Sequence, residues 1–309
     1  MQLVTFGEAM LRLTPRGSGF DVYVGGAELN VAVAAAKLGI ASRWVSRLPE
    51  NPAGRVIARR AQEEGVDVSC VAWTSEGRAG VFYVEVGDDP SATTVTYDRA
   101  GSAMAFIAPG MIDWASTLRD ASWLHVSGIT PALSESAAAT MSECLAAARA
   151  EGLTISYDLN YRPKLWSPER ARIVQEPLLS HADLFIAGED AARLVFGLEQ
   201  NTAENVAREL QRRYDLPAVA ITVRDSKRRR SATWSALVVA DGATHCAQPQ
   251  SCEVIDPLGA GDAFAGGLIA ARMHNESWTR AVRDGVSLAA KKHGTRGDFS
   301  TATSADPCS

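Results

Sequence analysis

The sequence predicts an α/β protein in which a mostly parallel, doubly wound sheet carries helices on both faces. Short apolar runs alternate with longer segments of helical periodicity through much of the chain, which is the order that parallel sheets produce. Several of these runs are fully apolar, as is typical of strands covered on both faces. Ligands of such sheets bind outside the carboxyl ends of the strands, so a functional site is expected there.

Strands and helices are expected to follow one another in a regular order. The apolar runs predict strands at 3–6, 44–46, 123–127, 154–158, 184–187, 219–223 and 236–239. Helical periodicity predicts helices at 27–38, 52–64, 134–150, 168–179, 203–214, 261–274 and 278–291. Hydroxyl side chains at helix starts and glycines at helix ends support these boundaries. The expected N-caps are Ser134 and Ser167, and the expected stops are Gly39, Gly65 and Gly152.

Two segments, at about 11–24 and 77–101, depart from this pattern. They contain alternating apolar and polar residues joined by Gly, Pro, Ser and Asp, a pattern that predicts short strands and turns. We expect them to form a small antiparallel sheet inserted into the larger fold, within a single domain spanning 1–309. Such a sheet can act as a lid that excludes water from a site; an edge sheet without a functional role is the alternative.

Composition and charge exclude several classes of function. The 309 residues are 46% hydrophobic and 22% charged, with a formal net charge of −5, which argues against a dedicated nucleic-acid binder. The dense basic run 227–230 is then either a solvated loop or a nucleotide-phosphate contact. Five cysteines without a Cys-x-x-Cys pair and scattered histidines indicate neither a disulfide framework nor a zinc site. The chain shows no leader pattern or membrane-length apolar run, so we expect a cytoplasmic protein without a membrane partner.

The first motif that can carry chemistry is a pair of glycines, Gly25 and Gly26, ahead of an alanine-rich helix. Glycines at this position allow a small ligand to approach the backbone. Asn30 lies one turn into the helix and can both donate and accept hydrogen bonds, which suits a sugar hydroxyl.

The second motif follows the predicted strand 154–158, where Asp158, Asn160, Arg162 and Lys164 form a polar cluster. Because this is the carboxyl end of a strand, the cluster is expected at the ligand-binding edge of the sheet. Arg162 has the geometry to pair with a carboxylate or phosphate through two hydrogen bonds.

The third motif, DPLGAGDAFAGG at 256–267, places glycines at the start of a predicted helix. The backbone N–H groups of Gly259, Ala260 and Gly261, together with the helix dipole, favour a bound anion. Asp262 is then positioned to take the proton of an attacking hydroxyl next to a phosphate. Asp256 either orients the loop or orders a cation. The Walker-A motif is absent, and the glycine spacing does not match a dinucleotide fingerprint.

In this order the three motifs resemble those of the ribokinase-like (phosphofructokinase B) sugar kinases, and the resemblance runs nearly end to end. It implies that Gly25, Gly26 and Asn30 contact the sugar, that Gly259, Ala260 and Gly261 form an anion hole, and that Asp262 is the catalytic base. It also implies ATP and Mg²⁺ as cofactors, with a monovalent cation such as K⁺ left open, and a homodimer or higher oligomer formed through the lid.

Within the family, residues 97–103 are similar to a stretch of the 2-keto-3-deoxygluconate kinases. This resemblance implies phosphorylation of a sugar acid at its terminal hydroxyl. Two arginines near one pocket agree with an anionic sugar acid, but fructokinases share the Asp-x-Asn-x-Arg pattern, so a neutral-sugar kinase is the alternative. The implied substrate residues, besides Gly25, Gly26, Asn30 and Asp262, are Tyr83, Tyr97, Arg99, Ile129 and Arg162.

The chain departs from the family pattern on its nucleotide side. The family's Asn-x-x-Glu motif is replaced by Gly-Glu-Asp-Ala at 188–191, and our hypothesis is that Glu189 or Asp190 takes over an indirect role in holding the metal. The residues expected to contact the nucleotide, besides Gly259 and Gly261, are Glu189, Thr222, Arg224, Ser226 and Lys227. The altered motif leaves open a protein that binds sugar and nucleotide without turnover. A NAD-linked dehydrogenase would need a glycine fingerprint after the first strand, which residues 6–10 do not supply.

Overall fold

A large sheet of eleven strands forms the centre of the molecule in the computed structural model, which describes residues 1–87, 92–228 and 231–303, and only the backbone of 225–228. The strand order is β14-β13-β12-β11-β10-β9-β1-β4-β5, with β15 paired to β13 and β6 paired to β4. All pairs from β12 to β5 are parallel, as is β4–β6, whereas β13 pairs antiparallel with β12, β14 and β15. The strands are β1 Gln2–Phe6, β4 Ala41–Pro49, β5 Val66–Asp67, β6 Val71–Thr74, β9 Trp123–Ser127, β10 Thr154–Asp158, β11 Leu184–Gly188, β12 Ala218–Arg228, β13 Ser231–Ala240, β14 Ala243–Cys246 and β15 Gln250–Glu253.

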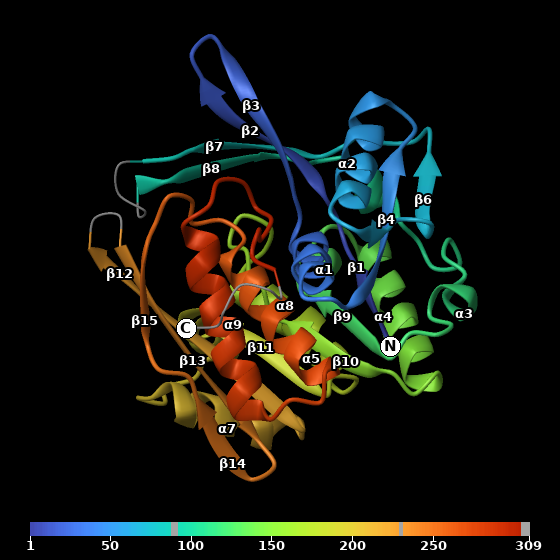
Figure 1. Cartoon of the computed structure of the whole chain (residues 1–309). Coiled ribbons are helices and arrows are strands. Elements are labelled where there is room, and N and C mark those ends of the chain that lie inside the picture. The colour runs from blue at the N-terminus through green and yellow to red at the C-terminus, as the bar shows by residue number, and fades with distance from the viewer. Residues whose placement is uncertain (88–91, 229–230, 304–309) are drawn as a thin grey trace.

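Helices cover both faces of this sheet (Figure 1). The helices are α1 Ala27–Lys37, α2 Pro52–Glu63, α3 Trp114–Thr117, α4 Glu135–Ala150, α5 Pro168–Leu179, α6 Glu189–Phe196, α7 Ala203–Tyr214, α8 Ala260–Met273 and α9 Trp278–His293, with short 3-10 turns η2 Ala103–Phe106 and η3 Thr130–Ala132. Among the residues that the structure describes, no helix is long and apolar enough to cross a membrane.

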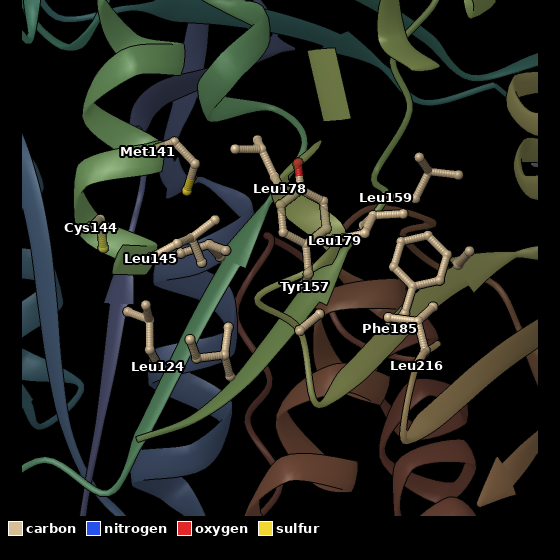
Figure 2. Packing of buried hydrophobic residues seen from close by; sticks show 14 of the residues in the cluster. Leu124, Met141, Cys144, Leu145, Tyr157, Leu159, Leu178, Leu179, Phe185 and Leu216 are labelled. Carbon is tan, nitrogen blue, oxygen red and sulfur yellow. The ribbon is translucent and has the colours of Figure 1, made fainter. Parts of the chain in front are cut away.

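Successive side chains of the central strands point to opposite faces of the large sheet, so each face has its own hydrophobic core. Val4 of β1 packs in a cluster with α4, α5, α6 and α7, whereas its neighbour Leu3 packs in another with α1, α8 and α9. Figure 2 shows the first core, where Met141 and Leu145 of α4 lie over the strands that carry Leu124 and Tyr157. The predicted fold class, a doubly wound sheet between two helical layers, is therefore confirmed.

The local signals at helix ends act as the sequence predicts. Ser134 accepts a hydrogen bond from the backbone N–H of Ala137, and Ser167 accepts one from Arg170. The glycines expected to stop helices have φ values of 86° at Gly39, 88° at Gly65 and 72° at Gly152, the left-handed region that glycine adopts without strain. The sequence did not predict α3, α6 or the edge strands β5, β6, β14 and β15.

The two segments that depart from the α/β pattern form a separate four-stranded sheet, sheet B, in the order β3-β2-β7-β8. Its strands are β2 Met10–Arg16, β3 Gly19–Gly25, β7 Val81–Glu85 and β8 Thr94–Asp98, and they lie along the top of Figure 1. The outer pairs are antiparallel as predicted, whereas β2 and β7 are parallel, which is possible because a long connection separates them. One face of sheet B packs Phe82 and Val84 against Leu258, directly before α8.

Candidate active site

Two cavities meet at the N-terminus of α8. The larger, about 710 Å³ and here called the outer cleft, runs along the carboxyl ends of β10, β11 and β12. The smaller, about 70 Å³ and here called the inner pocket, lies between sheet B and the start of α1. Both are lined by Tyr97, Arg162, Leu258, Gly259 and Asp262. A group held at Asp262 is therefore within reach of ligands in either cavity.

The first turn of α8 presents backbone N–H groups without a side-chain cap. Gly259 is the N-cap with φ of 79°, and no side chain caps the helix. A Cβ atom at Gly259 would lie 2.1 Å from the backbone oxygen of Asp298, so only glycine fits. The first N–H groups of a helix have no intrahelical acceptor and lie at the positive end of its dipole. This end of the outer cleft is consequently suited to a phosphate or another anion.

Asp262, in the first turn of α8, is fixed by Asn30 of α1. Asn30 Nδ2 donates to Asp262 Oδ2 at 2.6 Å, and Asn30 Oδ1 accepts from the backbone N–H of Gly26 at 3.3 Å. Burial raises the pKa of Asp262, and the Asn30 hydrogen bond and the charges of Arg162 and Lys292 oppose that rise. The result is an oriented carboxyl group whose other oxygen, Oδ1, has no hydrogen-bond partner among the described residues, as the chemistry of a general base requires.

Two further buried acids lie close to this group. Glu28 accepts a 2.6 Å hydrogen bond from Ser127, and burial raises its pKa to about 7. Burial, with a contribution from the charge of Asp262, also raises the pKa of Asp158 to about 7. The site thus gathers carboxyl groups from α1, β10 and α8, and burial raises the pKa of all three.

An ion cluster, defined here as Arg12, Asp256 and Asp298, joins sheet B to the loop before α8. The Arg12 guanidinium lies 2.7 Å from Asp256 and 2.6 Å from Asp298, and Arg12 is 1% exposed. Asp256 also accepts hydrogen bonds from the backbone N–H groups of Leu258 and Gly297. Asp256 was expected either to orient the loop or to order a cation. These contacts support the first role, because they hold the loop directly.

The two arginines expected to contact the sugar acid differ in their surroundings. Both line the inner pocket, but Arg99 forms an ion pair with the buried carboxylate of Glu8. Arg162 makes one long hydrogen bond among the described residues, from Nη1 to the backbone oxygen of Tyr161 at 3.4 Å. Arg162 is therefore the arginine with donors to spare, whereas the charge of Arg99 is already matched.

One predicted substrate residue, Tyr83, lies away from the inner pocket. Tyr83 does not line the inner pocket; its neighbour Phe82 does. Successive side chains of a strand point to opposite faces, and Phe82 is on the face that packs against Met10 and Leu258, whereas the Tyr83 ring lies 5.9 Å from that of Phe20. The alternation of side chains along β7 was visible in the sequence. Which face of β7 lies toward the site, however, depends on how sheet B packs against the loop before α8.

The other candidates that the structure describes lie at the two cavities. Glu189, Asp190, Thr222, Arg224, Ala260 and Gly261 line the outer cleft; Gly25, Gly26, Asn30, Arg99 and Ile129 line the inner pocket; Tyr97, Arg162, Gly259 and Asp262 line both. The side chains of Ser226 and Lys227 fall outside the described residues. Sequence reasoning missed Glu8, Met10, Phe82 and Asp298, which also line the inner pocket. Glu8 follows the first strand, so its position at a carboxyl strand end was an available signal.

The known proteins that this chain resembles are carbohydrate kinases. The family model for pfkB family carbohydrate kinases matches residues 2–303. The chain is 36% identical over 310 residues to a 2-dehydro-3-deoxygalactonokinase of Haloferax volcanii, covering 98% of this chain and 94% of the relative. It is 31% identical over 316 residues to a 2-dehydro-3-deoxygluconokinase of Bacillus subtilis, covering 97% and 91%. The crystal structure of 2-dehydro-3-deoxygluconokinase from Thermotoga maritima superimposes with a TM-score of 0.94 at 34% identity, covering 98% and 96% of the two chains.

Proposed function

Because the chain belongs to the pfkB family of carbohydrate kinases, we propose that it transfers the γ-phosphoryl group of ATP to the terminal hydroxyl of a 2-keto-3-deoxy sugar acid. The proposed substrate is 2-keto-3-deoxygluconate, and the product is its 6-phosphate. The galactonate form, which differs at C4, is the second candidate because the Haloferax relative is named for it. The observation that carries the proposal is the position of Asp262, between an anion-binding helix start and a second, smaller pocket.

In this proposal the sugar acid occupies the inner pocket and ATP the outer cleft. The oxygen of the terminal hydroxyl attacks the γ-phosphorus while Asp262 accepts the hydroxyl proton. The bond between the γ-phosphorus and the oxygen that bridges it to ADP breaks, and its electron pair stays on ADP. The backbone N–H groups at the start of α8 stabilise the charge that develops on the transferred phosphoryl oxygens. Asn30 holds the base in place, and Arg162, with its free donors, pairs with the substrate carboxylate.

The walls of the outer cleft fit a metal that arrives with the nucleotide. Glu189 and Asp190 line this cleft, and carboxylate oxygens suit Mg²⁺ that keeps most of its water ligands. No cluster of three or more acidic, histidine or cysteine side chains that could hold a metal occurs in the described part of the chain, so these two residues would act through water. Mg²⁺ would neutralise phosphate charge when bound.

We also propose that a second copy of the chain covers the outer face of sheet B. Phe20 is 51% exposed and Val22 is 56% exposed; the two residues are two positions apart on β3 and so share a face, and the Phe20 ring contacts Tyr83 of β7. Exposed apolar residues gathered on one face are typical of an interaction surface. Sedimentation of the purified protein over a range of concentrations tests this, and a monomer at all concentrations would contradict it.

The test of function uses purified protein with ATP and Mg²⁺ and a panel of substrates: both C4 epimers of the keto acid, gluconate, fructose and ribose. The expected result is the highest kcat/KM with a keto acid, and a fall of about 100- to 10,000-fold in kcat for Asp262→Asn. A preference for fructose or ribose would contradict the substrate, and full activity of Asp262→Asn would contradict the base. Calorimetric binding of sugar acid and nucleotide without turnover would identify a binding protein instead.

A further inference from the structure

Glu8 and Arg99 form a buried ion pair in the wall of the inner pocket. Glu8 follows β1 and Arg99 follows β8, so the pair joins the large sheet to sheet B. Arg99 Nη2 contacts Glu8 Oε2, and the two side chains are only 10% and 2% exposed. The Arg99 guanidinium also lies 5.6 Å from the centre of the Tyr97 ring. Both groups are therefore held in fixed positions and removed from bulk water.

Each member of this pair keeps one polar atom without a partner. Glu8 Oε1 and Arg99 Nε are buried and make no hydrogen bond within the described structure. Leaving such an atom unpaired costs about 1–3 kcal/mol, and more when the group is charged. Because both residues line the inner pocket, an occupant of the pocket is the natural partner for these atoms.

The chemistry of the two open atoms selects the kind of partner. One is an acceptor and the other a donor, and a hydroxyl group both donates and accepts. A carboxylate only accepts, and beside Glu8 it would meet a like charge. The substrate carboxylate therefore belongs with Arg162, which borders the same pocket and has donors to spare.

We propose that Glu8 determines substrate specificity by accepting a hydrogen bond from a sugar hydroxyl, and that Arg99 holds the Glu8 carboxylate in place and donates to the same hydroxyl through Nε. The hydroxyl is a secondary one, because the terminal hydroxyl belongs at Asp262. This assignment rests on the proposed function in taking the occupant to be a sugar acid. It assigns Arg99 to a sugar hydroxyl and to orienting Glu8, and leaves the substrate carboxylate to Arg162.

The experiment measures steady-state kinetics of Glu8→Ala, Glu8→Gln and Arg99→Met with each C4 epimer of the keto acid and with ATP. Glu8→Ala is expected to raise the sugar KM by about 10- to 100-fold, because a hydrogen bond to a charged group is lost, while kcat and the ATP KM change by less than about threefold. Glu8→Gln keeps an oxygen acceptor, so its sugar KM rises less. If the hydroxyl that donates to Glu8 is the one at C4, Glu8 discriminates between the two epimers. The ratio of their kcat/KM values then moves toward one in Glu8→Ala.

A matched control separates this role from a structural one. Glu64 is also a largely buried glutamate in ion pairs, with Lys37 and Arg60, and it lies at neither cavity; Glu64→Ala should leave the sugar KM unchanged. A sugar KM in Glu8→Ala and Glu8→Gln that equals that of the unmodified protein would overturn the proposal. So would a rise in the ATP KM equal to the rise in the sugar KM.

The proposed function can fail separately. If the unmodified protein phosphorylates a neutral sugar and not the keto acids, the same variants are measured with that sugar. A raised KM for that sugar would support the role of Glu8, although the substrate assignment would be wrong. An unchanged KM would contradict the role of Glu8 as well. If Glu8→Ala does not fold, Glu8→Gln and Arg99→Met decide the question, because each keeps most of the buried volume.

Discussion

At the scale of single residues, the charge state of Asp262 depends on its neighbours. Burial alone would favour the protonated acid, and the Asn30 hydrogen bond, Arg162 and Lys292 each favour the carboxylate. A base must be deprotonated before it can accept the proton of a hydroxyl. Asn30 therefore contributes to the readiness of Asp262 as well as to its position.

Replacing Asn30 with alanine should move the acidic limb of the pH profile of kcat/KM to higher pH. The hydrogen bond lowers the pKa of Asp262, so its removal raises that pKa, and more acid is protonated near neutral pH. A shift of about one pH unit or less and a fall in kcat of about 10- to 100-fold are expected. The exposed Asn205 serves as control, because its side chain makes one hydrogen bond among the described residues, to Asn201, and lines neither cavity. An unchanged acidic limb would contradict the role assigned to Asn30.

At the scale of elements, the start of α8 combines two demands that glycine alone meets. The backbone of Gly259 is left-handed, and the chain near Asp298 passes close to its Cα atom. Gly242, in the turn between β13 and β14, has a similar φ of 74°, but a Cβ atom there would meet nothing within 4 Å. Alanine substitution at Gly242 measures the effect of backbone strain alone. The same substitution at Gly259 adds the effect of disturbing the anion-binding loop.

Gly259→Ala is expected to lower the free energy of unfolding by about 2–5 kcal/mol, through strain and a steric clash. It should lower kcat by at least about 100-fold, because the loop donors no longer face the phosphoryl group. Gly242→Ala should cost only about 1–2 kcal/mol and leave kcat unchanged. Urea unfolding and steady-state kinetics of both variants check this. Equal effects on kcat would show that the loop geometry is not what matters at Gly259.

Local signals predicted many of the elements, and long-range packing decided the rest. Periodicity and caps predicted the central strands and seven helices, because those signals lie within a few residues of one another. The α6 helix begins at Glu189, directly after β11, without a capping residue to indicate it. Tyr83 and Phe82 could not be told apart because the docking of sheet B chooses between the faces of β7. The Glu8–Arg99 pair spans 91 positions, which no local pattern reveals.

At the scale of the whole molecule, the fold gathers buried acids that reduce its stability at neutral pH. Glu28 and Asp158 have pKa values raised to about 7 and Asp298 to about 6, in each case chiefly by burial. They come from α1, β10 and the C-terminal segment, so only the folded chain brings them close to the site. Such a cluster favours function at the expense of stability, and this cost is measurable as a dependence of stability on pH.

Glu28→Gln should flatten that dependence between about pH 4.5 and pH 7. The unfolded chain releases the Glu28 proton near the ordinary value of 4.5, whereas the folded protein retains it up to about pH 7. The folded state therefore binds more protons across this interval, so the stability contributed by protonated Glu28 is complete below pH 4.5 and is lost as the pH rises through 7. Glutamine does not titrate, and its amide oxygen can still accept the hydrogen bond from Ser127.

The free energy of unfolding of Glu28→Gln, relative to the unmodified protein, should consequently increase with pH, by up to about 3 kcal/mol at pH 8. Urea unfolding of both proteins at pH 5, 6, 7 and 8 measures this difference. Burial lowers the pKa of His125 to about 3 and that of His293 to about 4, which gives both proteins an opposite slope below pH 6.5, but that slope cancels in the difference. A difference that stays constant from pH 5 to pH 8 would mean that Glu28 is already ionised in the folded protein at pH 5. The pKa values of the carboxyl groups around Asp262 would then be lower than their burial implies.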